Sequence, residues 1–129
     1  MKFILLALFV FTTSLHAYDD DSRRKEVEES NKSEGYPTTL ANGVYIHGYV
    51  YNADLDAMVL VLVGNYFKDK SATAKQMLDY WNGQVGQALR KKGFRDFAVL
   101  LTTEIDGGGV IFSPRFNKWM NADDYLKLK

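Results

Sequence analysis

Alternation of apolar and polar residues predicts two strands in the first half of the chain. From Val44 to Tyr51, every second residue is aliphatic or glycine, a period that suits a strand with two unlike faces. Turn-forming residues follow at 52–56, and an unbroken apolar run extends from Ala57 to Val63. Such a run is typical of a central strand covered on both faces. We therefore predict a hairpin whose second strand lies inside the sheet.

A helical period follows the hairpin. Apolar residues recur at spacings of three and four from Ala72 to about Lys92, which predicts one long helix with Ser71 as its N-cap. Gly93 follows a basic cluster, so positive charge meets the negative end of the helix dipole and glycine can close the last turn. We predict that the helix ends there.

The rest of the chain predicts a second hairpin and a short helix. Residues 94–105 have strand character, 106–109 form a glycine-rich turn, and 110–113 form a returning strand. Asn121 is placed to cap a last helix that runs from residue 122 to about 128. The predicted order is ββαββ with a C-terminal helix.

This order predicts an α+β fold in two layers, with a mainly antiparallel four-stranded sheet and one long helix packed on one face. Because the apolar run at 57–63 avoids water on both sides, the second face of the sheet also needs a cover. We expect that cover from the segment around Phe116, Trp119 and Tyr125, or from a partner.

The N-terminus has the three-part layout of a secretory signal peptide. A positive start at Met1 and Lys2 leads into an apolar run at 3–11 and then into polar and small residues up to Ala17. The apolar run is shorter than the roughly 20 residues that span a bilayer. We expect cleavage after about Ala17 and a mature chain that is periplasmic or secreted. A retained membrane anchor is the alternative.

Charged residues dominate the segment after the signal peptide. Between Tyr18 and Ser33, Val27 is the only aliphatic residue, so little apolar surface is available to offset the entropy of ordering. We predict a charged flexible arm and polar lead-in at 18–43, followed by a single domain at 44–129.

The composition of the chain excludes or disfavours several kinds of site and partner. The chain has no cysteine, which excludes disulfides and thiolate sites and fits an exported bacterial protein. Its 16 basic and 16 acidic residues balance, which argues against nucleic acid as a partner. His47 is the single histidine after signal removal, so no multi-histidine metal site and no cofactor is expected.

Two surfaces are candidates for binding a partner. The first is a row on one face of the predicted strand, where aromatic bodies carry polar tips suited to recognition. Its members are Tyr45, His47, Tyr49 and Tyr51. The alternative is that these aromatics belong to the core of the domain.

The second candidate surface is the face of the long helix opposite its apolar stripe. Its middle is nearly uncharged and contains two glycines, which would let a partner backbone approach closely. The residues are Gln76, Gly83, Gly86 and Gln87. A kinked or suboptimal exposed helix is the alternative.

These features favour a small exported, non-enzymatic binding protein. Its expected partner is another protein of the bacterial envelope, which it would inhibit, neutralise as an immunity protein or help to assemble. An exported hydrolase that pairs His47 with Asp96, Glu104 or Asp106 is the alternative, although no serine elbow or paired-carboxylate motif accompanies these residues. A homo-oligomeric structural protein is a third hypothesis.

Overall fold

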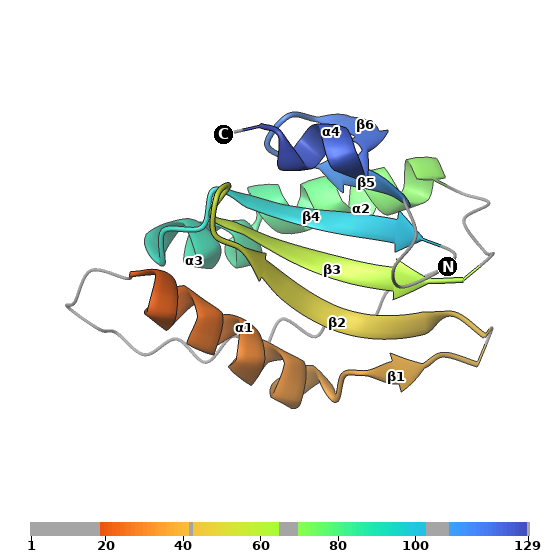
Figure 1. The fold of residues 1–129 in the computed structure, drawn as a ribbon, viewed down its shortest axis with the longest axis horizontal. Helices are drawn as coiled ribbons and strands as arrows, with labels where there is room; N and C mark the ends of the chain where they lie inside the picture. The colour runs from red at the N-terminus through yellow and green to blue at the C-terminus, as the bar shows by residue number, and fades with distance from the viewer. Residues whose placement is uncertain (1–18, 42, 65–69, 103–108, 129) are drawn as a thin grey trace.

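A six-stranded mixed sheet organises the protein. The computed structural model describes residues 19–41, 43–64, 70–102 and 109–128, and the strand order follows the chain from β1 to β6 (Figure 1). The strands are β1 (Thr38–Thr39), β2 (Tyr45–Asn52), β3 (Ala57–Val63), β4 (Asp96–Thr102), β5 (Gly109–Ser113) and β6 (Lys118–Asn121). The helices are α1 (Asp20–Glu34), α2 (Lys70–Asn82), α3 (Gln84–Lys91) and α4 (Ala122–Leu126).

The α+β class is confirmed, but the predicted sheet of four strands is wrong. Short strands β1 and β6 extend it at both edges, and β3 pairs with β4 in parallel, whereas the other neighbours are antiparallel. The parallel pair arises because α2 and α3 carry the chain back to the end of the sheet where β3 began, as a parallel connection requires.

The predicted hairpin and its central strand are confirmed. β2 and β3 pair antiparallel, and β3 pairs with β4 along its whole length, from Ala57 opposite Asp96 to Val63 opposite Thr102. All residues of β3 except Val63 are buried. The continuous apolar run therefore reflects a strand covered on both faces.

The single long helix is wrong because the chain breaks at Gly83, which is the extended N-cap of α3. A Cβ on Gly86 would lie 1.6 Å from the carbonyl oxygen of Trp81, so the two helices meet where only glycine fits. The glycines therefore mark a break in the helix, as in the alternative interpretation of a kinked helix. α2 also begins at Lys70, which puts Ser71 inside the helix rather than at its cap.

The predicted end of the helical region at Gly93 is confirmed. Gly93 has a φ of 87°, and its N–H donates to the carbonyl of Arg90 at 3.0 Å. The N–H of Phe94 donates to the carbonyl of Leu89, also at 3.0 Å. Both side chains of that second pair are buried, so the Schellman motif also closes an apolar contact at the start of β4.

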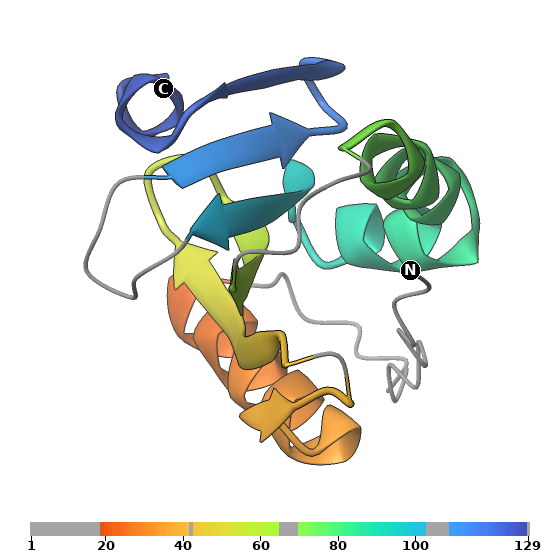
Figure 2. The same ribbon diagram turned by 90° about the vertical axis from the view of Figure 1, so that its right-hand side faces the viewer.

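Helices cover the two faces of the sheet unequally. α2 and α3 lie on one side, here called the inner face, and α4 lies on the other, the outer face (Figure 2). Val27 of α1 also belongs to the inner core. The outer core gathers around Tyr125 with Phe116 beside it, so the expected cover by the C-terminal segment is confirmed for these two residues. Trp119 instead packs on the inner face.

Residues 20–34 form α1, so the expected flexible arm is corrected here. The Asp19 carboxylate accepts from the N–H of Ser22 at 2.8 Å at the start of the helix, and Gly35, with a φ of 74°, closes its end. The density of charge suggested a flexible segment, but polar contacts to the sheet, rather than apolar burial, hold this helix.

The predicted signal peptide lies outside the described residues. No helix in the described ranges has the length and apolar character needed to cross a membrane.

Candidate functional site

A β-bulge reorganises β2. Ile46 and Gly48 pair with consecutive residues of β3, which leaves His47 without a residue opposite it. Gly48 has a φ of 121°, and a Cβ there would lie 2.6 Å from Oδ1 of Asn31 on α1. The bulge therefore needs glycine both for its backbone conformation and for the close approach of α1.

The bulge splits the predicted row of aromatic side chains between the two faces. Tyr45 and His47 stay on the outer face, where their ring centroids lie 6.4 Å apart. Beyond the bulge, Tyr49 and Tyr51 point inward, and Tyr49 is only 4% exposed. The four side chains do not form one surface. Val50, expected on the face of Val44, turns outward for the same reason.

Tyr49 and Gln76, expected on separate surfaces, both contact residues of the inner core. The ring of Tyr49 lies 5.5 Å from that of Tyr36, and the two side chains are hydrogen-bonded. Tyr80 packs against the same core and accepts a hydrogen bond of 3.0 Å from Nε2 of Gln76. Burial raises the pKa of Tyr36 to about 12 and also raises the pKa of Tyr49. These side chains therefore belong to the inner core rather than to an exposed surface.

Tyr51 ties α1 to the sheet. Its hydroxyl accepts from Nε of Arg23 at 2.9 Å and lies 2.8 Å from Oδ1 of Asp56, to which it can donate its proton. The guanidinium of Arg24 stands 5.2 Å from the ring centroid. Burial is the largest effect that raises the pKa of Tyr51, to about 12. The Tyr51 side chain therefore holds α1 against the sheet rather than forming part of an exposed aromatic row.

The remaining helix-face candidates are dispersed by the break between α2 and α3. Gly86 is buried and Gly83 is half-buried, whereas Gln87 is exposed. Arg90 closes over the break, with its guanidinium 4.7 Å from the Trp81 ring and a 2.8 Å hydrogen bond to the Trp81 carbonyl. The glycines are thus explained by the close approach of one helix to the next.

The outer face carries an apolar groove that the sequence analysis missed. Its volume is about 160 Å³, and it lies between β2 and α4. Val50 and Leu126 line it and are 39% and 53% exposed. Its other lining residues are Tyr51, Asn52, Val59, Leu100, Ile111, Ala122 and Tyr125. The available signal was Gly48 inside the strand, because a glycine within a strand often marks a bulge, and the extra residue of this bulge, His47, reverses the alternation beyond it.

A buried carboxylate anchors α4 over that face. Asp96 is 1% exposed, and its Oδ2 accepts from the hydroxyls of Ser113 and of Tyr125, the latter at 2.8 Å. Oδ1 accepts from the N–H groups of Phe97 and Arg115 at 2.9 and 3.1 Å. Burial is the main cause that raises the pKa of Asp96. The network fixes the position of the helix that walls the groove.

The structure separates His47 from one of its proposed acidic partners. Asp96 lies opposite Ala57 at the start of β3, whereas the bulge lies opposite Val61 and Leu62. Four to five strand residues correspond to about 13–17 Å, which is too far for a hydrogen bond. The other proposed partners, Glu104 and Asp106, lie outside the described residues. So does the predicted turn at 106–109, except for Gly109, which begins β5.

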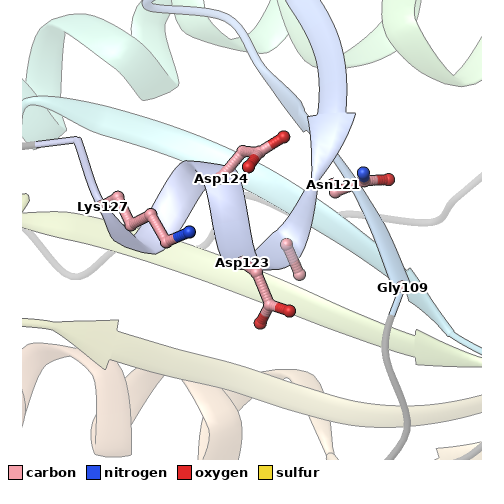
Figure 3. A pocket seen from close by; sticks show the side chains of 6 residues that line it. Gly109, Asn121, Asp123, Asp124 and Lys127 are labelled. Carbon is pink, nitrogen blue, oxygen red and sulfur yellow. The ribbon is translucent and has the colours of Figure 1, made fainter.

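A polar pocket of about 400 Å³ lies where α4 meets β5. Gly109 and Asn121 line it together with Asp123, Asp124 and Lys127. The two carboxylates point away from each other rather than toward a common point (Figure 3). Within the described parts of the chain, no group of three or more His, Cys, Asp or Glu side chains is placed to hold a metal ion.

Comparison of the chain with protein-family models, with curated proteins and with solved structures found no match.

Proposed function

We propose that this chain is a small exported, non-enzymatic binding protein that engages another protein of the bacterial envelope as an inhibitor, immunity protein or assembly factor. The observation that carries the proposal is the apolar groove on the outer face, with the exposed side chains of Val50 and Leu126 among its lining residues. Export rests on the signal-peptide pattern of the first 17 residues.

The composition of the outer face suits recognition of a protein. Val50 and Leu126 offer apolar anchors beside a groove, the arrangement in which a partner side chain can be desolvated. Tyr45 and His47 share this face and add aromatic area with hydrogen-bonding tips. An apolar centre with polar neighbours is the usual anatomy of a protein interface.

The buried titratable groups support a binding role over catalysis. Asp96 and Tyr125 hydrogen-bond each other inside the outer core, and Tyr49 is bonded to Tyr36 inside the inner core. Their pKa values are raised, with burial as the largest cause in each case. A satisfied interior network of this kind stabilises a scaffold without leaving these groups open to a substrate.

Affinity capture with variant baits tests the proposal. The mature chain, Tyr18 to Lys129, is immobilised and exposed to envelope extract of the source organism, in parallel with Val50→Lys and Leu126→Lys variants. Each lysine would place a charge at the centre of the contact, so we expect retention of a stoichiometric partner to fall about 10-fold or more.

Gln87→Lys is the matched control, because it adds the same charge at an exposed position on α3. It should retain the partner at the level of the unmodified bait. All baits must show the same cooperative thermal transition. A partner retained equally by the Val50→Lys and Leu126→Lys baits would contradict a site on the outer face.

A further inference from the structure

Polar contacts, more than apolar ones, hold α1 against the rest of the protein. Over its 15 residues, Val27 and Ser30 are the two that are buried. A helix of this length is marginal in water without tertiary support. Its attachment therefore depends on a small number of identifiable links to the sheet and to α3.

The first link joins α1 to the end of α3. Nζ of Lys92 lies 2.5 Å from Oε1 of Glu26, and the two side chains are 5% and 12% exposed. Because both charges are largely removed from water, loss of either one leaves the other poorly solvated. This ion pair is a specific contact rather than a surface pair of little consequence.

The second link joins α1 to the turn between β2 and β3. Besides its bond to the Tyr51 hydroxyl, Arg23 places Nη2 3.3 Å from Oδ1 of Asp56. Its side chain is 11% exposed. Arg23 thus spans from the helix to the strand and to the turn that follows.

The third link occupies the edge of β2. The Asn31 amide accepts from the N–H of Tyr49 at 2.6 Å and donates to its carbonyl at 2.9 Å. A neighbouring strand would make the same pair of bonds to this peptide edge. β1 pairs with β2 only at Tyr45 and Ile46, so beyond the bulge a side chain of α1 replaces a strand.

We propose that α1 is a displaceable strap: it opens as a unit while the sheet stays folded, and its opening uncovers the β2 edge at Tyr49. Opening breaks these three links and exposes Val27, but it leaves the pairing of β2 through β5 intact. Val27 of α1 packs on the inner face, whereas the groove lies on the outer face; Tyr51 belongs to both, because it lines the groove and accepts from Arg23. An uncovered edge can accept an added strand, which gives the opening a consequence for recognition.

Native-state hydrogen exchange of the mature chain tests the strap. In low concentrations of urea, amides of α1 should exchange through an opening with little denaturant dependence, well before the amides of β3 and β4. Glu26→Gln should accelerate exchange across α1 about 10-fold or more and leave β3 and β4 within about twofold. Glu28→Gln is the control, because it removes the same charge from an exposed position of the same helix.

Asn31→Ala gives a second perturbation, near the C-terminal end of α1. It removes both hydrogen bonds to Tyr49 and should accelerate α1 selectively, as Glu26→Gln does. If α1 exchanges at the same rate and with the same denaturant dependence as β3, the helix is an inseparable part of the sheet domain and the proposal is wrong. The proposal also fails if Glu26→Gln and Glu28→Gln have equal effects on α1.

Discussion

At the scale of single residues, Asp96 shows how one polar side chain can organise several elements. Standing at the start of β4, it bonds Tyr125 of α4 and Ser113 of β5 and accepts from the backbone of Arg115. From the sequence, Asp96 was a candidate acidic partner of His47, and nothing in the pattern indicated its burial. Periodicity cannot identify a buried acid, because its donors come from distant parts of the chain.

The raised pKa of Asp96 predicts a pH-dependent stability. A carboxyl group whose pKa rises on folding binds its proton more tightly in the folded protein than in the unfolded chain. Its contribution to the free energy of unfolding is therefore full below the ordinary value of 3.8 and is lost as the pH rises through the folded value. In Asp96→Asn, the hydroxyls of Ser113 and Tyr125 can still hydrogen-bond the side-chain amide, and the amide does not titrate.

We expect the free energy of unfolding of the wild type, minus that of Asp96→Asn, to fall as the pH rises above about 4. Urea denaturation at a series of pH values measures this difference, in which titrations shared by both proteins cancel. A difference that grows with pH would mean that the four donors outweigh burial and lower the pKa of Asp96 instead.

At the scale of elements, the pattern of apolar positions predicted β2, β3, β4 and β5, and the capping position of Asn121 predicted the C-terminal helix. The same method missed α1, whose single buried aliphatic residue, Val27, gives no periodic signal. It also assigned Val50 to the wrong face, because a regular alternation has no place for the bulge at Gly48. The helix and the bulge contact each other through Asn31, so both depend on tertiary structure more than on the local sequence pattern.

The break between α2 and α3 makes a prediction about its two glycines. A Cβ on Gly86 would lie 1.6 Å from a backbone carbonyl, whereas a Cβ on Gly83 would lie 2.9 Å from the nearest atom, the Asp79 carbonyl oxygen. Gly86→Ala must therefore shift one helix against the other, and we expect it to cost about 3 kcal/mol of unfolding free energy.

Gly83→Ala also brings a Cβ too close to a backbone oxygen and replaces an N-cap glycine, but the approach is 1.3 Å less severe, so we expect it to cost less, about 1–2 kcal/mol. Urea denaturation of both variants measures the difference. Equal costs would show that the backbone at the break relaxes freely and that the close approach at Gly86 is not required.

At the scale of the whole molecule, the sequence predicted the layers of the fold more accurately than it predicted the pairing and direction of the strands. It indicated a sheet, helical cover on one face and a C-terminal cover on the other, but the mixed pairing and the edge strands required knowledge of the chain path. The candidate site changed for a different reason, the bulge in β2. Tyr49 and Tyr51, which the strand period grouped with Tyr45 and His47, belong to the inner face, and an apolar groove takes their place as the candidate surface.

The small exposed apolar area around the outer-face groove favours binding of a different protein over self-association. Among the described residues, Val50 and Leu126 are the large hydrophobic side chains that are exposed. A stable homodimer typically buries about 800 Å² or more on each subunit, with an apolar fraction near 65%. Two exposed aliphatic side chains are too few for such an interface, but they suffice as anchors for a non-obligate complex.

We therefore expect the mature chain to remain a monomer in analytical ultracentrifugation up to its highest soluble concentration. Val50→Lys should not change its sedimentation, because no copy of the chain is bound at the outer face. A stable dimer that dissociates in Val50→Lys would instead assign the groove to self-association and favour the homo-oligomeric hypothesis. A dimer that persists in this variant would place the contact elsewhere, and the β2 edge under α1 would be the next surface to substitute.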